Sequence, residues 1–249
     1  MTKRITSLKL YTILMIITTV LCKLPDYIQV CQRTDANIDQ CIQKSIEHLK
    51  PFLKVGIPEL NVPPLELLSL NSTLHFNVGS GDAQILTNLT NLVVYGAENF
   101  QLNQLWSDIE KNSFRYNVTI PRVNMHGIYQ IDTKLLFLKI QGEGNFSVQV
   151  ENYNFECVMS GHKVKIENIE HLKFDKLPCE IQFGQASIQL DNLFGGNQVL
   201  GTAVNDVVNE NVDIFFKEVK PKIVEAIENV FLKTANRITL TFNYDDLFP

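Results

Sequence analysis

The sequence predicts an α+β fold, in which a long C-terminal helix is wrapped by a highly curved antiparallel sheet. Three observations support this. Apolar and polar residues alternate from about residue 74 to residue 190, apolar residues recur at helical spacing over residues 197–237, and a shorter segment of helical spacing covers residues 37–54. The chain has 249 residues, 45% of them hydrophobic, which is enough for a sizeable core.

The N-terminus differs from the rest of the chain. Lys3, Arg4 and Lys9 precede an apolar run over residues 10–21, and Cys22 is a small residue before the expected cleavage point. We interpret residues 1–22 as a secretory signal peptide and residues 23–249 as a single domain. The alternative is a membrane anchor, but the run is shorter than the roughly 20 apolar residues that a spanning helix needs.

Removal of residues 1–22 takes away three cations and no acids, so the formal net charge falls from −5 to −8. An acidic chain has no electrostatic basis for binding nucleic acid or an anionic membrane. We therefore expect no nucleic-acid partner, no stable membrane insertion and an extracellular location.

Four cysteines remain after that cleavage, and an even number in an oxidising compartment indicates two disulfides. Three pairings are possible, and we favour the local one, Cys31 with Cys41 and Cys157 with Cys179. No cysteine or histidine spacing typical of a zinc site occurs, so we expect no metal and no cofactor.

Four N-x-S/T sequons are candidate N-glycosylation sites, which would need solvent-facing positions. They begin at Asn71, Asn88, Asn117 and Asn145.

The first element of the predicted domain is an amphipathic helix over residues 37–54, where Pro51 suggests a kink or an early stop. It is followed by "GIPELNVPPLELL", Gly56 to Leu68, which carries three prolines among aliphatic residues. Because proline cannot extend this helix or join the centre of a sheet, we predict an extended connector that closes one end of the wrap.

The central strands are bounded by Gly, Asn and Pro and follow one another at hairpin spacing, which predicts a long antiparallel meander. Most of them are apolar on one face, and that face must be covered. The helical segment over residues 197–237 can cover it, with a bend or break predicted at Pro221. Its predicted inner stripe consists of Leu200, Val204, Val207, Val208, Ile214, Phe215, Ile223, Ile227, Val230, Phe231 and Ile238.

Several segments together resemble the insect takeout and juvenile hormone-binding protein family over essentially the whole mature chain. They are the early cysteine pair, "CIQKSIEHLKPFLKVGIPELNVPPLELL", "IPRVNMHGIYQIDTKLLFLKIQGEGNFSVQV", "LDNLFGGNQVLGTAVNDVVNENVDIFFKEVKPKI" and the closing "YDDLFP". The resemblance implies a tubular lipid-binding fold and secretion into haemolymph or sensory fluid. It also implies an internal tunnel that carries an apolar small molecule.

If such a tunnel exists, the long helix and the strands should supply its lining. The candidates are Trp106, Tyr129, Tyr153, Val204, Val208, Asn211, Phe215 and Phe231. Asn211 could bind a ligand oxygen, or it could be a core asparagine satisfied by backbone or water. The tyrosines and Trp106 could each present a ring and one donor, or could be ordinary packing.

Motifs of hydrolases, metalloproteases and nucleotide-binding enzymes are absent from the sequence, so we expect no catalytic residues. The leading hypothesis is a secreted carrier of a long apolar molecule, such as a terpenoid or a fatty-acid derivative. The alternative is a secreted signalling or structural glycoprotein with a packed core, whose partner would be a protein receptor.

Overall fold

The computed structural model describes residues 24–70, 73–78, 83–135 and 138–249. The predicted signal peptide and Asn71 lie outside the described residues. The helices are α1 (Ile38–Val55), α2 (Gln198–Glu210), α3 (Val212–Thr239) and α4 (Tyr244–Leu247), with single 3-10 turns η1 (Pro58–Leu60), η2 (Ala97–Asn99) and η3 (Phe194–Gly196). The strands are β1 (Leu68–Leu70), β2 (Leu74–Val78), β3 (Ala83–Tyr95), β4 (Gln101–Asp108), β5 (Ser113–Leu135), β6 (Leu138–Ile166), β7 (Ile169–Lys176), β8 (Cys179–Gln182) and β9 (Gln185–Leu190).

All nine strands form one antiparallel sheet built on a long central hairpin. β5 has 23 residues and β6 has 29, so each is long enough to pair with shorter strands along its length. β3 and β4 pair with different parts of β5, while β7, β8 and β9 pair with different parts of β6. Register shifts interrupt the β3–β5, β4–β5 and β6–β7 ladders, and such bulges increase the bend and twist of a sheet. The predicted curved antiparallel sheet is confirmed, but it is not a simple meander, because several strands share β5 or β6 as their partner.

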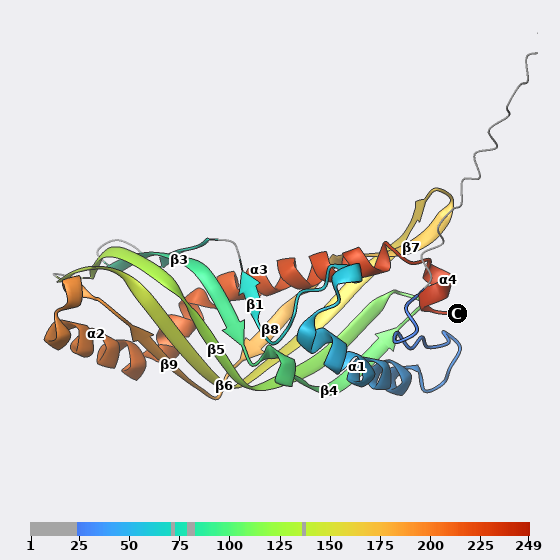
Figure 1. The fold of residues 1–249 in the computed structure, drawn as a ribbon, viewed down its shortest axis with the longest axis horizontal. Coiled ribbons are helices and arrows are strands. Elements are labelled where there is room, and N and C mark those ends of the chain that lie inside the picture. Colours follow the sequence, from blue (N-terminus) through green and yellow to red (C-terminus); the bar gives the residue numbers. More distant parts are fainter. Residues whose placement is uncertain (1–23, 71–72, 79–82, 136–137) are drawn as a thin grey trace, which may run out of the picture.

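The helices cover one face of this sheet, which we call the inner face; the opposite face is the outer face. Figure 1 shows an elongated molecule with α3 along its length, α2 at one end, and α1 and α4 at the other. α3 contacts β7, β8, β9 and β2, whereas α2 contacts β9. The predicted α+β architecture, with a long C-terminal helix against a curved sheet, is therefore observed.

Three helix asparagines attach α2 and α3 to the edges of the sheet. The side-chain amide of Asn236 accepts a hydrogen bond from the Phe174 backbone N–H at 2.7 Å and donates one to the carbonyl of the same residue at 2.8 Å. Asn205 and Asn209 of α2 make the same double contact with Leu190 and Ile188 of β9, at 2.7–2.9 Å. β7 and β9 are edge strands, and their free backbone groups are satisfied in this way by side chains.

Both predicted disulfides are present. Cys31–Cys41 ties the N-terminal segment to α1, with a Cα–Cα distance of 5.9 Å. Cys157–Cys179 joins directly opposite residues of β6 and β8, and both of its cysteines are buried. The local pairing is therefore confirmed.

A break at Pro221 and an early stop at Pro51, each one of two predicted alternatives, are not observed. The C-terminal helical segment breaks at Asn211, whose backbone is not helical (φ −119°, ψ 25°), and the helix continues through Pro221 inside α3. Pro51 likewise lies inside α1, which ends only at Val55 before Gly56. The loss of one backbone hydrogen bond at each proline is tolerated within these helices, which are also held by tertiary contacts.

The proline-rich connector is also different from the prediction. Instead of being extended, it turns through η1, and Ile57 pairs with Val62 across an isolated bridge. Ile57, Leu60 and Val62 are buried in one cluster with Phe242 near the C-terminus. The connector therefore packs as a compact turn against the end of the chain.

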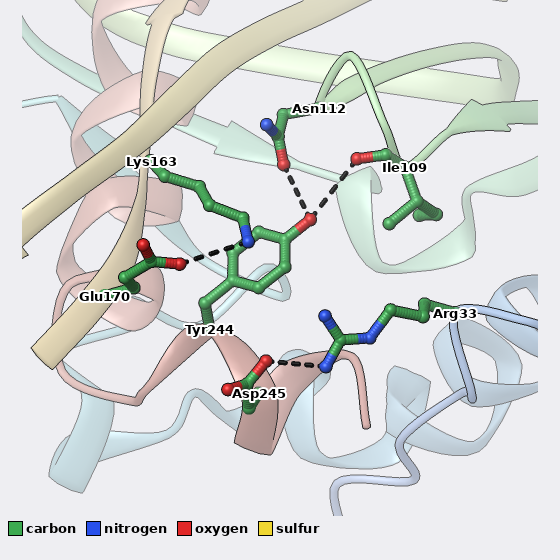
Figure 2. A network of polar contacts seen from close by, with 7 residues as sticks. All are labelled: Arg33, Ile109, Asn112, Lys163, Glu170, Tyr244 and Asp245. Carbon is green, nitrogen blue, oxygen red and sulfur yellow. Dashed lines mark hydrogen bonds and ion pairs between the residues drawn. The ribbon is translucent and has the colours of Figure 1, made fainter.

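The C-terminal segment is fixed to the same end of the molecule by a polar network around Tyr244 (Figure 2). The buried Tyr244 hydroxyl donates to Asn112 Oδ1 at 2.9 Å, and Lys163 Nζ lies 3.8 Å from the centre of the Tyr244 ring. Arg33 pairs with Asp245 at 2.6 Å. These contacts join both ends of the described chain to the β4–β5 turn and to β6.

Candidate functional site

The inner face of the central hairpin is apolar. Val118 and Ile120 of β5 lie on this face with Phe155 and Cys157 of β6, and all four are buried. Strand alternation places these residues on one side because each pair is two residues apart. The residues of α3 that pack against this cluster, and remain partly accessible, are Phe216, Ile223, Val224 and Leu232.

Two tyrosines lie on the same face. Tyr116 is directly opposite Cys157, and Tyr153 is directly opposite Ile120, so both side chains share the face of the buried cluster. Burial raises the pKa of both phenols above the ordinary value, although both residues keep some accessible surface. Within the described part of the chain, neither hydroxyl has a hydrogen-bond partner.

Tyr129 and Tyr244, which are fully buried, differ in this respect. Tyr129 donates its hydroxyl proton to the Asp191 carbonyl at 2.5 Å, and Tyr244 donates to Asn112. Desolvating a hydroxyl without a partner costs about 1–3 kcal/mol, so buried polar groups are normally paired. Tyr116 and Tyr153 therefore offer two unused hydrogen-bonding groups within apolar surroundings.

The other residues predicted to line a tunnel are spread over the molecule. Tyr129 is fully buried in a second cluster with Leu92, Phe146 and Leu193, and Val204 packs against this cluster. Val208 is half-buried in α2, and Phe231 is 40% exposed with its ring 6.4 Å from that of Phe155.

Two further candidates occupy other positions. Asn211 marks the α2–α3 break, where its side chain donates to the Val207 carbonyl at 2.8 Å. Trp106 lies on the outer face and is 44% exposed. Phe215 belongs to α3, but its side chain lies outside the described structure.

The predicted inner stripe of the helical segment holds for α3 better than for α2. Leu200 and Val207 of α2 are exposed, as are Ile214 and Phe231 of α3. The inward side of α2 instead carries Asn205 and Asn209, whose amides bind the edge of β9. The tyrosine of the apolar face that the sequence interpretation missed is Tyr116. Its alternation with Val118 and Ile120 was the available signal.

The described residues contain no group of three or more histidine, cysteine or acidic side chains that could hold a metal ion. In the same part of the chain, no helix combines the length and apolar character of a membrane span.

The family model described as haemolymph juvenile hormone binding protein matches residues 11–249. The circadian clock-controlled protein daywake of Drosophila melanogaster is 23% identical over 232 residues, covering 90% of this chain and 88% of that protein. Daywake of Drosophila yakuba is 23% identical over 222 residues, covering 84% of each chain.

A solved structure shares the fold. Takeout 1 of Epiphyas postvittana superposes with a TM-score of 0.76 at 19% identity, covering 89% of this chain and 99% of that one. The family match spans nearly the whole chain, and the superposition covers most of both structures. The chain therefore belongs to the haemolymph juvenile hormone binding protein family and has the takeout fold.

Proposed function

We propose that the protein is a secreted carrier that holds a long apolar molecule between the inner face of the sheet and α3. The observation that carries this proposal is the pair of phenol groups, Tyr116 and Tyr153, on an apolar face without hydrogen-bond partners among the described residues. Both tyrosines keep some accessible surface, and a bound molecule with oxygen atoms would supply the hydrogen-bond partners that the described residues do not.

The site favours an elongated ligand. α3 has 28 residues and is therefore about 42 Å long at 1.5 Å per residue. Apolar side chains of α3 face the sheet from Phe216 to Leu232. A terpenoid or fatty-acid derivative, including a molecule like juvenile hormone, matches this apolar, extended surface with few polar positions.

Secretion is part of the proposal. It is supported by the basic and apolar pattern of residues 1–22 and by two disulfides, which persist in oxidising compartments. We assign no catalytic role, because the matched family is one of binding proteins and the sequence contains no recognisable catalytic motif.

The test is to identify what the protein carries. The full-length chain is secreted from a eukaryotic host, purified, and extracted with organic solvent, and the extract is analysed by mass spectrometry. A bacterial secreted protein of similar size, purified in parallel, controls for adventitious lipid. We expect an apolar compound in near-stoichiometric amount. A clean extract, together with no displacement of a fluorescent fatty-acid analogue, would instead favour the glycoprotein that acts through a receptor.

A further inference from the structure

The outer face of the sheet carries an exposed tryptophan. Trp106 of β4 is 44% exposed, while its neighbour Leu105 is buried on the inner face. Opposite Trp106 is Arg115 of β5, whose guanidinium carbon lies 5.3 Å from the centre of the indole ring. Arg115 Nε in turn donates to Glu156 at 2.6 Å. The indole therefore lies beside a guanidinium group that is itself held in place, with much of its apolar surface in contact with water.

The sequon residue Asn117 lies next to this tryptophan on the same face. Asn117 is paired with Gln104, two residues from Trp106, so the two side chains are diagonal neighbours across β4 and β5. Such neighbours are about 7–8 Å apart, within reach of large side chains. The surrounding outer face is polar, since Asn103 and Asn154 donate to Asn117 Oδ1 at 2.6 and 3.1 Å.

We propose that Asn117 carries an N-linked glycan, and that the first sugar ring of this glycan packs on Trp106. A pyranose ring has one face of C–H groups that can cover an indole, and hydroxyl and acetamide groups at its rim. The indole supplies the apolar surface, and Gln104 and Arg115 supply hydrogen-bond donors beside it. The glycan thus shields an aromatic group that would otherwise remain an exposed apolar patch.

The other described sequons provide internal comparisons. Asn88 of β3 is paired with His75, whose Nδ1 lies 2.7 Å from Asn88 Oδ1. Asn145 of β6 is exposed and paired with Ile128. A glycan on either residue would start beside a different set of side chains, so its removal should leave Trp106 unaffected.

The chain contains a single tryptophan, so intrinsic tryptophan fluorescence reports on Trp106 alone. The full chain is secreted from cells that make only high-mannose glycans, and the occupancy of each sequon is measured by glycopeptide mass spectrometry. Acrylamide quenching is then compared between the intact glycoprotein, the protein trimmed to one N-acetylglucosamine by endoglycosidase H, and unglycosylated protein from the bacterial periplasm.

We expect Asn117 to be occupied, and we expect the intact and trimmed forms to lose most of the quenching seen in the unglycosylated form. The Asn145→Gln variant should quench like the parent glycoprotein. Equal quenching in the trimmed and unglycosylated forms would overturn the stacking of the first sugar on Trp106. An unmodified Asn117 beside an occupied Asn145 would overturn the assignment of the glycan. If no sequon is occupied in protein recovered from the medium, this inference is wrong, whereas the proposed secretion stands.

Discussion

Replacing Tyr153 by phenylalanine tests whether its hydroxyl serves a ligand or the fold. The hydroxyl has no protein partner in the described structure and keeps some accessible surface, so it contributes no hydrogen bond within the ligand-free protein. Tyr153→Phe should therefore leave the free energy of unfolding unchanged or raise it. Tyr116→Phe should behave in the same way, because Tyr116 lies on the same face of the neighbouring strand and also has no hydrogen-bond partner among the described residues.

The effect on binding should have the opposite sign. A neutral hydrogen bond contributes about 0.5–1.5 kcal/mol net, so the loss of one bond to a ligand oxygen should raise Kd about 2- to 13-fold. A hydrocarbon of the same length cannot use that bond, so its affinity should be unchanged or higher in Tyr153→Phe. The ratio of the two affinities therefore isolates the hydroxyl from general packing of the ring.

The matched control is Tyr244→Phe. The Tyr244 hydroxyl donates to the buried Asn112 at 2.9 Å, away from the apolar face, so its removal should lower the free energy of unfolding by about 1–3 kcal/mol and leave Kd unchanged. Urea unfolding of the delipidated proteins and displacement of a fluorescent fatty-acid analogue provide both measurements. If Tyr153→Phe destabilises the ligand-free protein as much as Tyr244→Phe does, the reasoning about the unpaired hydroxyl is refuted.

Three further predictions concern α3, its attachment and the buried phenols. Val224→Trp should prevent binding of the fluorescent analogue at little cost in melting temperature, and Asn229→Trp, at an exposed position of α3, is the control. A large loss of stability in Val224→Trp would instead indicate a packed core at this position. Asn236→Ala should lower the free energy of unfolding by about 1–3 kcal/mol in urea, because it frees two backbone groups of Phe174, and an effect no larger than that of Asn229→Ala would contradict this role. Burial raises the pKa of Tyr129 to about 12, so the folded state holds this proton more tightly than the unfolded chain does. The free energy of unfolding should therefore fall as pH rises from about 10 through 12. Urea midpoints that stay unchanged over this pH range would refute the prediction.

The sequence predicted the fold well because its signals are regular and local. Alternation over residues 74–190 identifies strands that are apolar on one face, and such a sheet needs a cover. The helical spacing after residue 197 supplies that cover. The disulfide pairing was also predictable as a preference for the nearest cysteines, and the cross-strand position of Cys157 and Cys179 explains it: β6 and β8 place the two residues directly opposite each other.

The helix break was not predictable from residue type. Proline is the stronger local breaker, yet Pro221 lies inside α3 and Asn211 ends α2. The reason is tertiary: Asn205 and Asn209 must reach β9, and this contact fixes the direction of α2 separately from that of α3. The predicted apolar stripe on residues 198–210 was partly wrong for the same reason, since polar amides occupy the side of α2 that meets the sheet.

The polar attachment of the helices also explains why the inner face can remain available to a ligand. Helices that cover a sheet by apolar packing alone approach until their side chains interdigitate. Here the side-chain amide of Asn236 is hydrogen-bonded to the backbone of β7, and those of Asn205 and Asn209 are hydrogen-bonded to the backbone of β9. These bonds of 2.7–2.9 Å determine where the helices meet the sheet edges. Among the described residues, Phe216, Ile223, Val224 and Leu232 of α3 contact the buried cluster in the middle of the sheet, and these side chains remain partly accessible. The amide hydrogen bonds at the sheet edges therefore hold the helices in place whether or not the space between α3 and the inner face is filled, which is the property that the proposed carrier needs.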